Sequence, residues 1–266
     1  MTPVALTIAG SDPSGGAGLQ ADLKTFHQHR VYGTSVVTLL TVQNTERVQA
    51  VEVLAPQLVL AQLDAVLDDI PPHAAKTGAL GNASIVEALA DRARSFSFPL
   101  VVDPVMISTH GARLLDADAI DAVARRLMPR AVLVTPNLPE AALLAEMELP
   151  DLAAAEKAAA AIARRGAPNV LIKGGHWEDE PVDLLWSEGR AHWLPGRRFP
   201  TRHTHGSGCV LSAAIAARLA RGEPLLAAVR AAKRFVTAAI QTSPQLGRGH
   251  GPLNLHAQGA GGGAES

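Results

Sequence analysis

The segment Leu100-Val101-Val102-Asp103-Pro104 indicates a parallel sheet, because three consecutive apolar residues are followed directly by the polar Asp103. Strands that are covered by helices on both faces, as in parallel sheets, have such continuous apolar runs. A second run, Val170-Leu171-Ile172, is followed in the same way by Lys173 and two glycines. Ligands of parallel α/β sheets collect outside the carboxyl ends of the strands. The residues that follow these runs are therefore candidates for a binding site.

Outward from these runs, short β-branched segments alternate with longer Ala- and Leu-rich periodic segments, which is typical of an α/β fold. We expect strands near residues 4–9, 35–42, 48–54, 74–78, 99–103, 131–135, 169–173, 182–187 and 190–194. We expect helices near residues 18–30, 56–69, 83–95, 116–128, 137–146, 152–165, 208–221 and 223–241. Trp186 and Trp193 flank a Ser-Glu-Gly-Arg turn, which predicts an antiparallel hairpin at a sheet edge.

The length and the absence of an internal linker predict one domain. A chain of 266 residues fits one large α/β domain, and hydrophobic residues, at 47%, suffice for a sizeable core. We predict a single domain over residues 1–256 and a disordered, glycine-rich tail over residues 257–266.

Composition also excludes several classes of partner. A formal net charge of -1 gives no electrostatic footprint for nucleic acid or for an anionic membrane. One cysteine, Cys209, rules out an internal disulfide and suits a reducing compartment. The N-terminus has no basic region and only a short apolar run, so we expect no signal sequence and no membrane span. These features predict a cytoplasmic enzyme that acts on small molecules.

Polar residues follow several of the expected strands and would meet at one edge of the sheet. They are Ser11-Asp12, Gln43-Asn44-Thr45, Lys76-Thr77-Gly78, Asp103-Pro104, Thr135-Pro136-Asn137 and Lys173-Gly174-Gly175-His176. A single such residue is ordinarily a helix cap or a satisfied turn, but this many together indicate a site.

The first glycine-rich turn, from Ser11 to Gly18, leads into a helix. Residues 16–21 formally match the G-x-G-x-x-[GA] dinucleotide pattern. The long loop before the glycines, and the lack of an acidic residue between Lys24 and Glu46, argue against a nicotinamide site. A loop closing over a small substrate is the favoured interpretation. Asp22, one turn into the helix, could face either solvent or that pocket.

The strongest local signal is His203-Thr204-His205-Gly206-Ser207-Gly208-Cys209, which precedes an apolar helix. Two glycines before a helix start allow backbone N–H groups to converge on an anion, which the helix dipole also favours. The alternative is a plain glycine-rich helix cap. The two histidines resemble a metal pair, but no third ligand lies nearby in the sequence, so we expect neutral, solvated histidines.

Cys209 would lie in the first turn of that helix, where the helix dipole is expected to lower its pKa below about 8.5. It could then accept the proton of a substrate hydroxyl, or it could be an inert packing residue. Because phosphoryl transfer depends more on charge stabilisation than on a strong base, a weak base would suffice.

Asn137-Leu138-Pro139-Glu140 has the spacing of a capping box, with Asn137 as the N-cap of a helix. The alternative is functional: Glu140 would organise Mg²⁺ and its waters near the phosphates of ATP, since Mg²⁺ prefers a few carboxylates plus phosphate oxygens. The sequence does not separate these two interpretations.

Taken together, these runs resemble the ribokinase-like superfamily and, more narrowly, the hydroxymethylpyrimidine/phosphomethylpyrimidine kinases of thiamine biosynthesis. The resemblance covers residues 4–254 in the family's order. The matching runs are 5–18, 20–25, 43–45, 103–106, 135–140, 173–176, 204–209 and 249–252. It implies a three-layer α/β/α sandwich, a homodimer, and two successive transfers from Mg-ATP, from the alcohol to the monophosphate and then to the diphosphate.

The resemblance also implies roles for individual residues. Gln43 would bind the aminopyrimidine ring, and the rest of that pocket would be Gly10, Ala17, Asp22, Val42 and Val105. Gly206 and Gly208 would form the anion hole beside the catalytic Cys209. Asp103 and Glu140 would place Mg²⁺, and the residues lining the nucleotide phosphates would be Asn137, Lys173 and Thr204.

Two rival functions stay open from the sequence. Ala79 stands where many relatives have Met against the pyrimidine, which enlarges the pocket and admits pyridoxine or pyridoxal as the substrate. A non-catalytic nucleotide or vitamin sensor would keep the fold without chemistry, although intact glycines and Glu140 argue against it.

Overall fold

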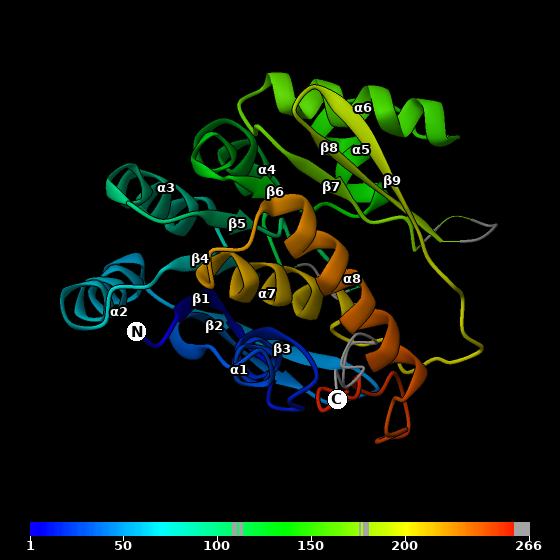
Figure 1. Ribbon diagram of the computed structural model, residues 1–266. Helices are drawn as coiled ribbons and strands as arrows, with labels where there is room; N and C mark the ends of the chain where they lie inside the picture. The colour runs from blue at the N-terminus through cyan, green and yellow to red at the C-terminus, as the bar shows by residue number, and fades with distance from the viewer. Residues whose placement is uncertain (108–110, 112–113, 176, 178–180, 258–266) are drawn as a thin grey trace.

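The computed structural model describes residues 1–107, 111, 114–175, 177 and 181–257. Within them one sheet has the strand order β3-β2-β1-β4-β5-β6-β7-β8-β9 (Figure 1). The strands are β1 (Val4–Ser11), β2 (Tyr32–Gln43), β3 (Val48–Val53), β4 (Ala74–Thr77), β5 (Leu100–Val102), β6 (Leu133–Val134), β7 (Val170–Ile172), β8 (Val182–Ser187) and β9 (Arg190–Pro195).

The centre of this sheet is parallel and its two margins are antiparallel. The strands from β2 through β1, β4, β5 and β6 to β7 pair in parallel. At one margin β3 pairs antiparallel with β2, and at the other β8 and β9 form an antiparallel hairpin. The predicted edge hairpin between Trp186 and Trp193 is therefore confirmed.

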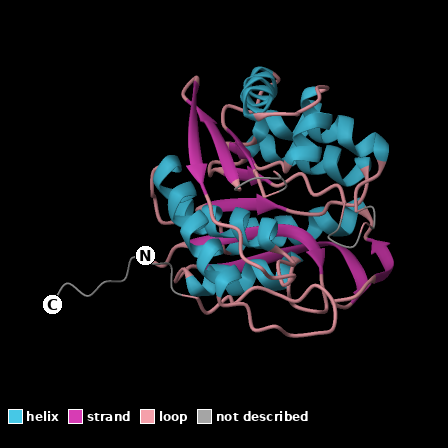
Figure 2. Cartoon of the chain, turned by 90° about the vertical axis from the view of Figure 1, so that its right-hand side faces the viewer, coloured by secondary structure: helices cyan, strands magenta, loops and turns pink. Residues whose placement is uncertain are grey.

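Helices cover both faces of the sheet, which makes three layers (Figures 1 and 2). Helices α2 (Pro56–Asp69), α3 (Ala83–Arg92), α4 (Ala117–Ala122), α5 (Leu138–Ala145) and α6 (Leu152–Arg164) supply buried residues to one core cluster. Helices α1 (Gly18–Gln28), α7 (Ser207–Ala220) and α8 (Leu225–Gln241) supply the other. The three-layer α/β/α sandwich expected from the resemblance is confirmed.

The apolar run Leu100-Val101-Val102 on β5 contributes side chains to both core clusters. Leu100 and Val102 pack into the cluster of α2 to α6, whereas Val101 packs into the cluster of α1, α7 and α8. Successive side chains of a strand point to opposite faces, so a strand between two helical layers needs apolar residues at every position. The run is unbroken for this reason.

A few element boundaries differ from the expectation. The strand expected from residue 35 begins at Tyr32. The helix expected over residues 116–128 is α-helical only to Ala122 and continues as a π-helical turn, Val123–Leu127, and a 3₁₀ turn, Met128–Arg130. Pro129 has no backbone N–H to continue an α-helix, which explains why the helix ends here.

The chain end departs from the expectation at one residue. Ala257, which we assigned to the disordered tail, is buried at 7% exposure, and its carbonyl accepts a hydrogen bond from Gln28. Residues 258–266 lie outside the described residues, so the rest of the tail stays a prediction. Among the described residues no helix is long and apolar enough to cross a membrane.

A buried ion pair ties α1 to the sheet. Lys76 Nζ on β4 lies 3.0 Å from Asp22 Oδ2 on α1, and both side chains are fully buried. Thr7 Oγ1 on β1 donates a second hydrogen bond, of 2.6 Å, to the same carboxylate oxygen. The Asp22 carboxylate raises the pKa of Lys76 against the opposing effect of burial, so the lysine stays charged. The pair fixes the position of the helix that begins at the first glycine-rich turn.

Removal of Lys76 is expected to lower the free energy of unfolding. Lys76→Met leaves the Asp22 carboxylate buried without its cation, and breaking such a pair costs about 3–5 kcal/mol. We expect this loss in the free energy of unfolding measured by guanidinium denaturation. The double variant Asp22→Asn/Lys76→Met carries neither charge and should regain most of the loss. Equal losses in the two variants would show that packing, not charge, is responsible.

Candidate active site

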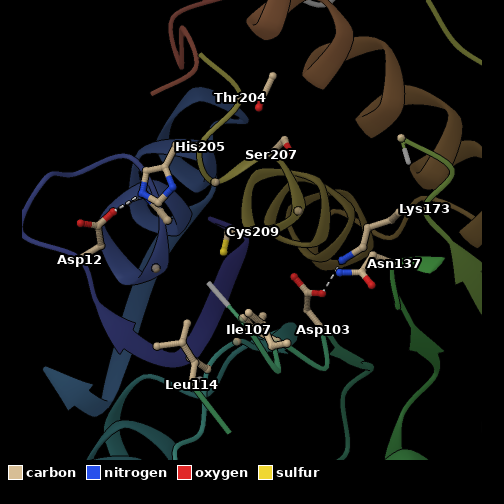
Figure 3. Close-up of a pocket in the computed structure, with 18 of the residues that line it drawn as sticks. Asp12, Asp103, Ile107, Leu114, Asn137, Lys173, Thr204, His205, Ser207 and Cys209 are labelled. Atoms are coloured by element: carbon tan, nitrogen blue, oxygen red, sulfur yellow. Dashed lines mark hydrogen bonds and ion pairs between the residues drawn. The ribbon is translucent and has the colours of Figure 1, made fainter. Parts of the chain in front are cut away.

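A cavity of about 740 Å³ lies where the parallel strands end. Its walls come from the ends of β1 and β2, from the segments that follow β1, β4, β5, β6 and β7, and from the start of α7 (Figure 3). The lining includes a residue from each polar run singled out in the sequence: Asp12, Gln43, Gly78, Asp103, Asn137 and Lys173. The expectation that these runs meet at one edge of the sheet is confirmed.

The start of α7 presents backbone N–H groups that no side chain among the described residues caps. Gly206, its N-cap, has a φ of 79°. A Cβ atom on Gly206 would lie 2.0 Å from the carbonyl oxygen of Gly16, so the two glycine-rich turns touch backbone to backbone. First-turn amides have no acceptor within their own helix. The arrangement leaves the amide end of α7 available to an anion.

Gly208 brings this helix start close to the charged residues of the site. A Cβ atom on Gly208 would lie 3.2 Å from Lys173 Nζ and 3.8 Å from Asp103 Oδ2. A side chain here would therefore press on the lysine. The lysine and the helix dipole both favour negative charge at this point.

Lys173 lies between two carboxylates. Its Nζ is 2.8 Å from Asp103 Oδ1 and 4.0 Å from Glu140 Oε2 (Figure 3 shows the first pair). Burial alone would lower the pKa of Lys173, but Asp103 and Glu140 raise it above its usual value. Ser212 Oγ lies 3.2 Å from Asp103 Oδ2 and 3.0 Å from the Cys209 carbonyl oxygen, so these two acceptors share its one hydrogen.

The capping box predicted at the start of α5 is present. Asn137 Oδ1 accepts from the Glu140 backbone N–H at 2.9 Å, and Glu140 Oε2 accepts from the Asn137 backbone N–H at 2.8 Å. Burial raises the pKa of Glu140, although Lys173 and these backbone bonds oppose the rise. Glu140 also lines the cavity, so its structural role does not remove it from the site.

The acidic groups suit a divalent cation only together with other ligands. Within the described part of the chain, no cluster of three or more His, Cys, Asp or Glu side chains could hold a metal ion. Asp103 and Glu140 do share one cavity, and Lys173 balances only one of their two charges. Mg²⁺ binds proteins through one or two carboxylates plus phosphate oxygens and water, and this donor set fits that habit.

The expected lowering of the Cys209 pKa is wrong. Burial raises the pKa of the Cys209 thiol to about 11, in spite of the opposing effects of the Lys76 cation and a hydrogen bond from the Gly18 backbone N–H. Asp22 and Asp103 add negative potential that raises it further. The helix dipole alone would lower the pKa of this thiol, but desolvation and the buried carboxylates outweigh it. The thiol, between the Asp12–His205 and Lys173–Asp103 pairs in Figure 3, is thus protonated at neutral pH.

The expected solvated histidines are also wrong. His205 is 3% exposed, and its Nε2 lies 2.8 Å from Asp12 Oδ2 and 3.2 Å from Gln43 Nε2. His203 is 7% exposed, and its Nδ1 accepts a 3.1 Å hydrogen bond from the Gly251 backbone N–H. The 249–252 turn folds over both residues, a long-range contact that no local pattern announces.

Three of the residues predicted to surround the ring with Gln43 line the cavity: Gly10, Ala17 and Val105. Asp22 is not among the lining residues, because Thr7 and Lys76 hold its carboxylate beneath the wall. Val42 is not among them either. It is 56% exposed and lies between Thr41 and Gln43, which do line the cavity, so its side chain points to the other face of β2.

The structure brings the three predicted residues Thr204, Asn137 and Lys173 together in the lining of the cavity. It also adds a segment that the sequence analysis missed. Arg197, Arg198 and Phe199 line the same cavity, and the Arg197 guanidinium stacks over the Phe199 ring at 5.5 Å. Two adjacent arginines shortly before the glycine-rich turn were the signal that could have found it.

The glycines of the first turn are explained by packing. A Cβ atom on Gly18 would lie 2.3 Å from the Gly10 carbonyl oxygen, and one on Gly16 would lie 2.7 Å from the His205 ring. These glycines let chain segments approach one another, which is a different task from cradling a pyrophosphate. The match to the dinucleotide pattern therefore carries no separate function.

Comparisons with known proteins agree with this geometry. The family model described as phosphomethylpyrimidine kinase matches residues 12–254. The hydroxymethylpyrimidine/phosphomethylpyrimidine kinase of Synechococcus elongatus is 49% identical over 255 residues, which cover 94% of this chain and 96% of that protein.

Two solved structures are similar over most of their length. An ADP complex of Bacillus subtilis pyridoxal kinase superposes with a TM-score of 0.89 at 38% identity, over 97% of this chain and 98% of that one. Clostridium difficile phosphomethylpyrimidine kinase gives 0.81 at 39% identity, over 90% of this chain and 100% of that one. With the family model matched from Asp12 to Asn254, this chain belongs to the phosphomethylpyrimidine kinase family.

Proposed function

We propose that this protein phosphorylates 4-amino-5-hydroxymethyl-2-methylpyrimidine with Mg-ATP, first to the monophosphate and then to the diphosphate, in thiamine biosynthesis. One observation carries the proposal. The uncapped start of α7, with Lys173 Nζ 3.2 Å from the Cβ position of Gly208, shares a cavity with the amide of Gln43. Groups that can bind a phosphoryl group, at the start of α7 and on Lys173, therefore share one cavity with Gln43, whose amide can hydrogen-bond a ring.

The phosphate half of the cavity would hold the nucleotide. Thr204, Asn137 and Lys173 offer a hydroxyl, an amide and an ammonium as donors to the phosphates of ATP. The amides of Gly206 and Gly208 would stabilise the charge on the group in transfer. Fixed donors of this kind cost no reorganisation at the moment of reaction, which is how positioned dipoles lower a barrier.

Asp103 and Glu140 would hold Mg²⁺ at this end of the cavity. When bound with the nucleotide, Mg²⁺ supplies positive charge to the phosphate oxygens. The Lys173 ammonium keeps the two carboxylates from repelling the nucleotide before the cation arrives. The capping box holds the Glu140 carboxylate in place throughout, and Ser212 contacts that of Asp103.

The ring would lie against Gln43 with Gly10, Ala17 and Val105 around it. We keep Asp22 and Val42 in the proposal only as supports of this wall, because neither side chain lines the cavity. Asp22 braces α1 from below through Lys76, and Val42 precedes Gln43 on β2.

Cys209 would contact the hydroxyl that accepts the phosphoryl group. Because its thiol is protonated at neutral pH, it cannot act as a preformed thiolate base. It can still orient the hydroxyl by hydrogen bonding. The loose transition state of phosphoryl transfer makes little demand on a strong base, so a neutral thiol is compatible with catalysis.

Pyridoxine or pyridoxal is a second candidate substrate. Ala79 lines the cavity and leaves more room than a larger residue would. The Bacillus subtilis pyridoxal kinase also superposes over nearly the whole chain. Both rings carry a hydroxymethyl group, so the phosphate half of the site would serve either one.

The first test is direct turnover. Incubation with Mg-ATP and hydroxymethylpyrimidine is expected to give the monophosphate and then the diphosphate, detected by mass. Pyridoxine is run in parallel, and we expect kcat/KM to favour the pyrimidine. A preference for pyridoxine of more than about tenfold, or about 1.4 kcal/mol in transition-state binding, would transfer the proposal to the second candidate. Binding of both ligands without any product would indicate a sensor instead.

The state of Cys209 can be measured without any substrate, because the chain has no other cysteine. With a pKa of about 11, the reactive thiolate fraction grows about tenfold for each pH unit below that value. We expect the rate of iodoacetamide alkylation to rise in this way from pH 7 to pH 10 without a plateau. A plateau near pH 8 would contradict the raised pKa.

The same residue has a kinetic test. Cys209→Ala is expected to lower kcat about tenfold, the worth of one hydrogen bond that orients the hydroxyl, with the KM for ATP unchanged. Full activity in this variant would remove Cys209 from the mechanism.

We further propose that the protein acts in the cytoplasm as a homodimer. Strand β3 is an open sheet edge, and beside it Leu40 and Val42 on β2 are 47% and 56% exposed. Exposed edges and apolar patches of this kind are normally covered by a partner. Light scattering should give twice the chain mass of 27.7 kDa. Leu40→Lys should shift it to the single mass with an unchanged circular dichroism spectrum, and a monomeric parent protein would contradict the proposal.

A further inference from the structure

Asp12, His205 and Gln43 form a chain of buried and half-buried polar contacts along the cavity wall. We propose that His205, held by Asp12, is a positioning residue that fixes which end of the Gln43 amide faces the bound ring. The inference rests on the proposed function in one respect only, namely that a heteroaromatic ring lies against Gln43. His205 Nε2 is 2.8 Å from Asp12 Oδ2, with the two side chains 3% and 5% exposed.

Asp12 is an acceptor in this chain of contacts. Its carboxylate accepts 2.9 Å hydrogen bonds from the Ser14 backbone N–H, the Ser14 hydroxyl and the Ala17 backbone N–H. Burial alone would raise the pKa of Asp12, but the bonds from His205 and Ser14 outweigh it and lower the pKa. An ionised carboxylate can only accept, so His205 Nε2 must carry the hydrogen that joins them.

This proton leaves no lone pair on Nε2 for a second donor. The atom of Gln43 that lies 3.2 Å from Nε2 can therefore not be a donating amide nitrogen. The two ends of a glutamine amide are assigned from their hydrogen-bond partners. The oxygen of Gln43 belongs beside His205, where the N–H edge of the imidazole attracts it.

Thr41 fits the same orientation at the other end of the amide. Its hydroxyl donates a 3.0 Å hydrogen bond to the Ser11 carbonyl oxygen, which uses its only hydrogen. The end of the Gln43 amide that lies 3.2 Å from Thr41 Oγ1 thus meets a lone pair. A nitrogen at this end donates to that lone pair, whereas an oxygen would compete with the Ser11 carbonyl for the single Thr41 hydrogen. Thr41 therefore accommodates the orientation that the His205 contact assigns.

The orientation has a consequence for recognition. With its oxygen toward His205 and one N–H toward Thr41, the Gln43 amide has one N–H left to offer a ligand. It would select a ring edge that carries an acceptor, such as the ring nitrogen of a pyrimidine. His205 also directly precedes Gly206, the N-cap of α7, so the same residue joins the ring wall to the turn that would hold the phosphoryl group.

A double-mutant cycle tests whether His205 acts through Gln43. His205→Phe removes the ring N–H, and we expect it to raise the KM for hydroxymethylpyrimidine about tenfold, the worth of one hydrogen bond, with little change in kcat. Gln43→Ala should raise the KM by a similar factor. The double variant His205→Phe/Gln43→Ala should be no worse than Gln43→Ala alone. An equal effect of His205→Phe in both backgrounds would overturn the proposal, since it would show a structural role in the α7 turn.

Two controls separate positioning from general loosening of the loop. Lys24 Nζ donates a 2.9 Å hydrogen bond to the Gly15 carbonyl in the same loop without touching His205. Lys24→Met should leave the KM for the pyrimidine within about twofold of the parent, and a larger change would count against the proposal. His205→Gln restores an N–H toward Asp12 and should recover part of the lost affinity, whereas a value no better than that of His205→Phe would contradict the role.

A spectroscopic measurement tests the position of the His205 proton without an activity assay. In long-range ¹H–¹⁵N correlation spectra of the parent protein, the His205 ring should show a hydrogen on Nε2, and Asp12→Asn should weaken that preference. An unprotonated Nε2 in the parent would overturn the proposal, even in a fully active enzyme. If hydroxymethylpyrimidine is not turned over, the proposed function fails while this readout still decides the orientation of Gln43.

Discussion

The site depends on one steric constraint, the backbone contact between two glycine-rich turns. Gly206 is so close to Gly16 that a Cβ atom would lie 2.0 Å from the Gly16 carbonyl oxygen. The turns belong to segments almost 190 residues apart, and each one begins a helix on the same face of the sheet. Their contact brings the amide ends of α1 and α7 together at one corner of the cavity. Any side chain at Gly206 would push the two turns apart.

Charge in the cavity is arranged around that corner. On one side Lys173 stands between Asp103 and Glu140, and on the other side His205 is paired with Asp12. Burial, with a smaller contribution from the carboxylates of Asp22 and Asp103, raises the pKa of the intervening Cys209 and keeps it protonated, which would not suit an enzyme that needs a strong nucleophile or base. It suits a transfer in which most of the barrier is lowered by fixed positive groups around the migrating phosphoryl group. The raised pKa of the thiol and the uncapped helix start are therefore parts of one electrostatic arrangement.

Local patterns in the sequence sufficed for the architecture and for much of the site. Unbroken apolar runs such as Leu100-Val101-Val102 mark strands that are buried on both faces, and the polar residues after them must reach one edge. The same reasoning could not place Asp22 or His205, because their positions depend on partners distant in the chain. Asp22 on α1 pairs with Lys76 on β4, and the 249–252 turn covers His205. The pKa of Cys209 was mistaken for the same reason, since desolvation is a property of the folded surroundings.

The two proposed substrates, a pyrimidine and a pyridine, would be distinguished at one end of the proposed site. In the proposed site, helix amides, Lys173 and two carboxylates would hold the phosphates, and the ring would lie against other residues. An alcohol on any flat heterocycle could present itself to these groups in the same way, so they cannot distinguish a pyrimidine from a pyridine. Discrimination is left to the opposite wall, where Ala79 sets the space and Gln43 sets the hydrogen-bonding pattern. A glutamine amide distinguishes rings only if its two ends cannot exchange, because a freely rotating amide would satisfy an acceptor or a donor equally. The Asp12–His205 hydrogen bond removes that freedom, so a contact between two residues of the cavity wall becomes a source of selectivity.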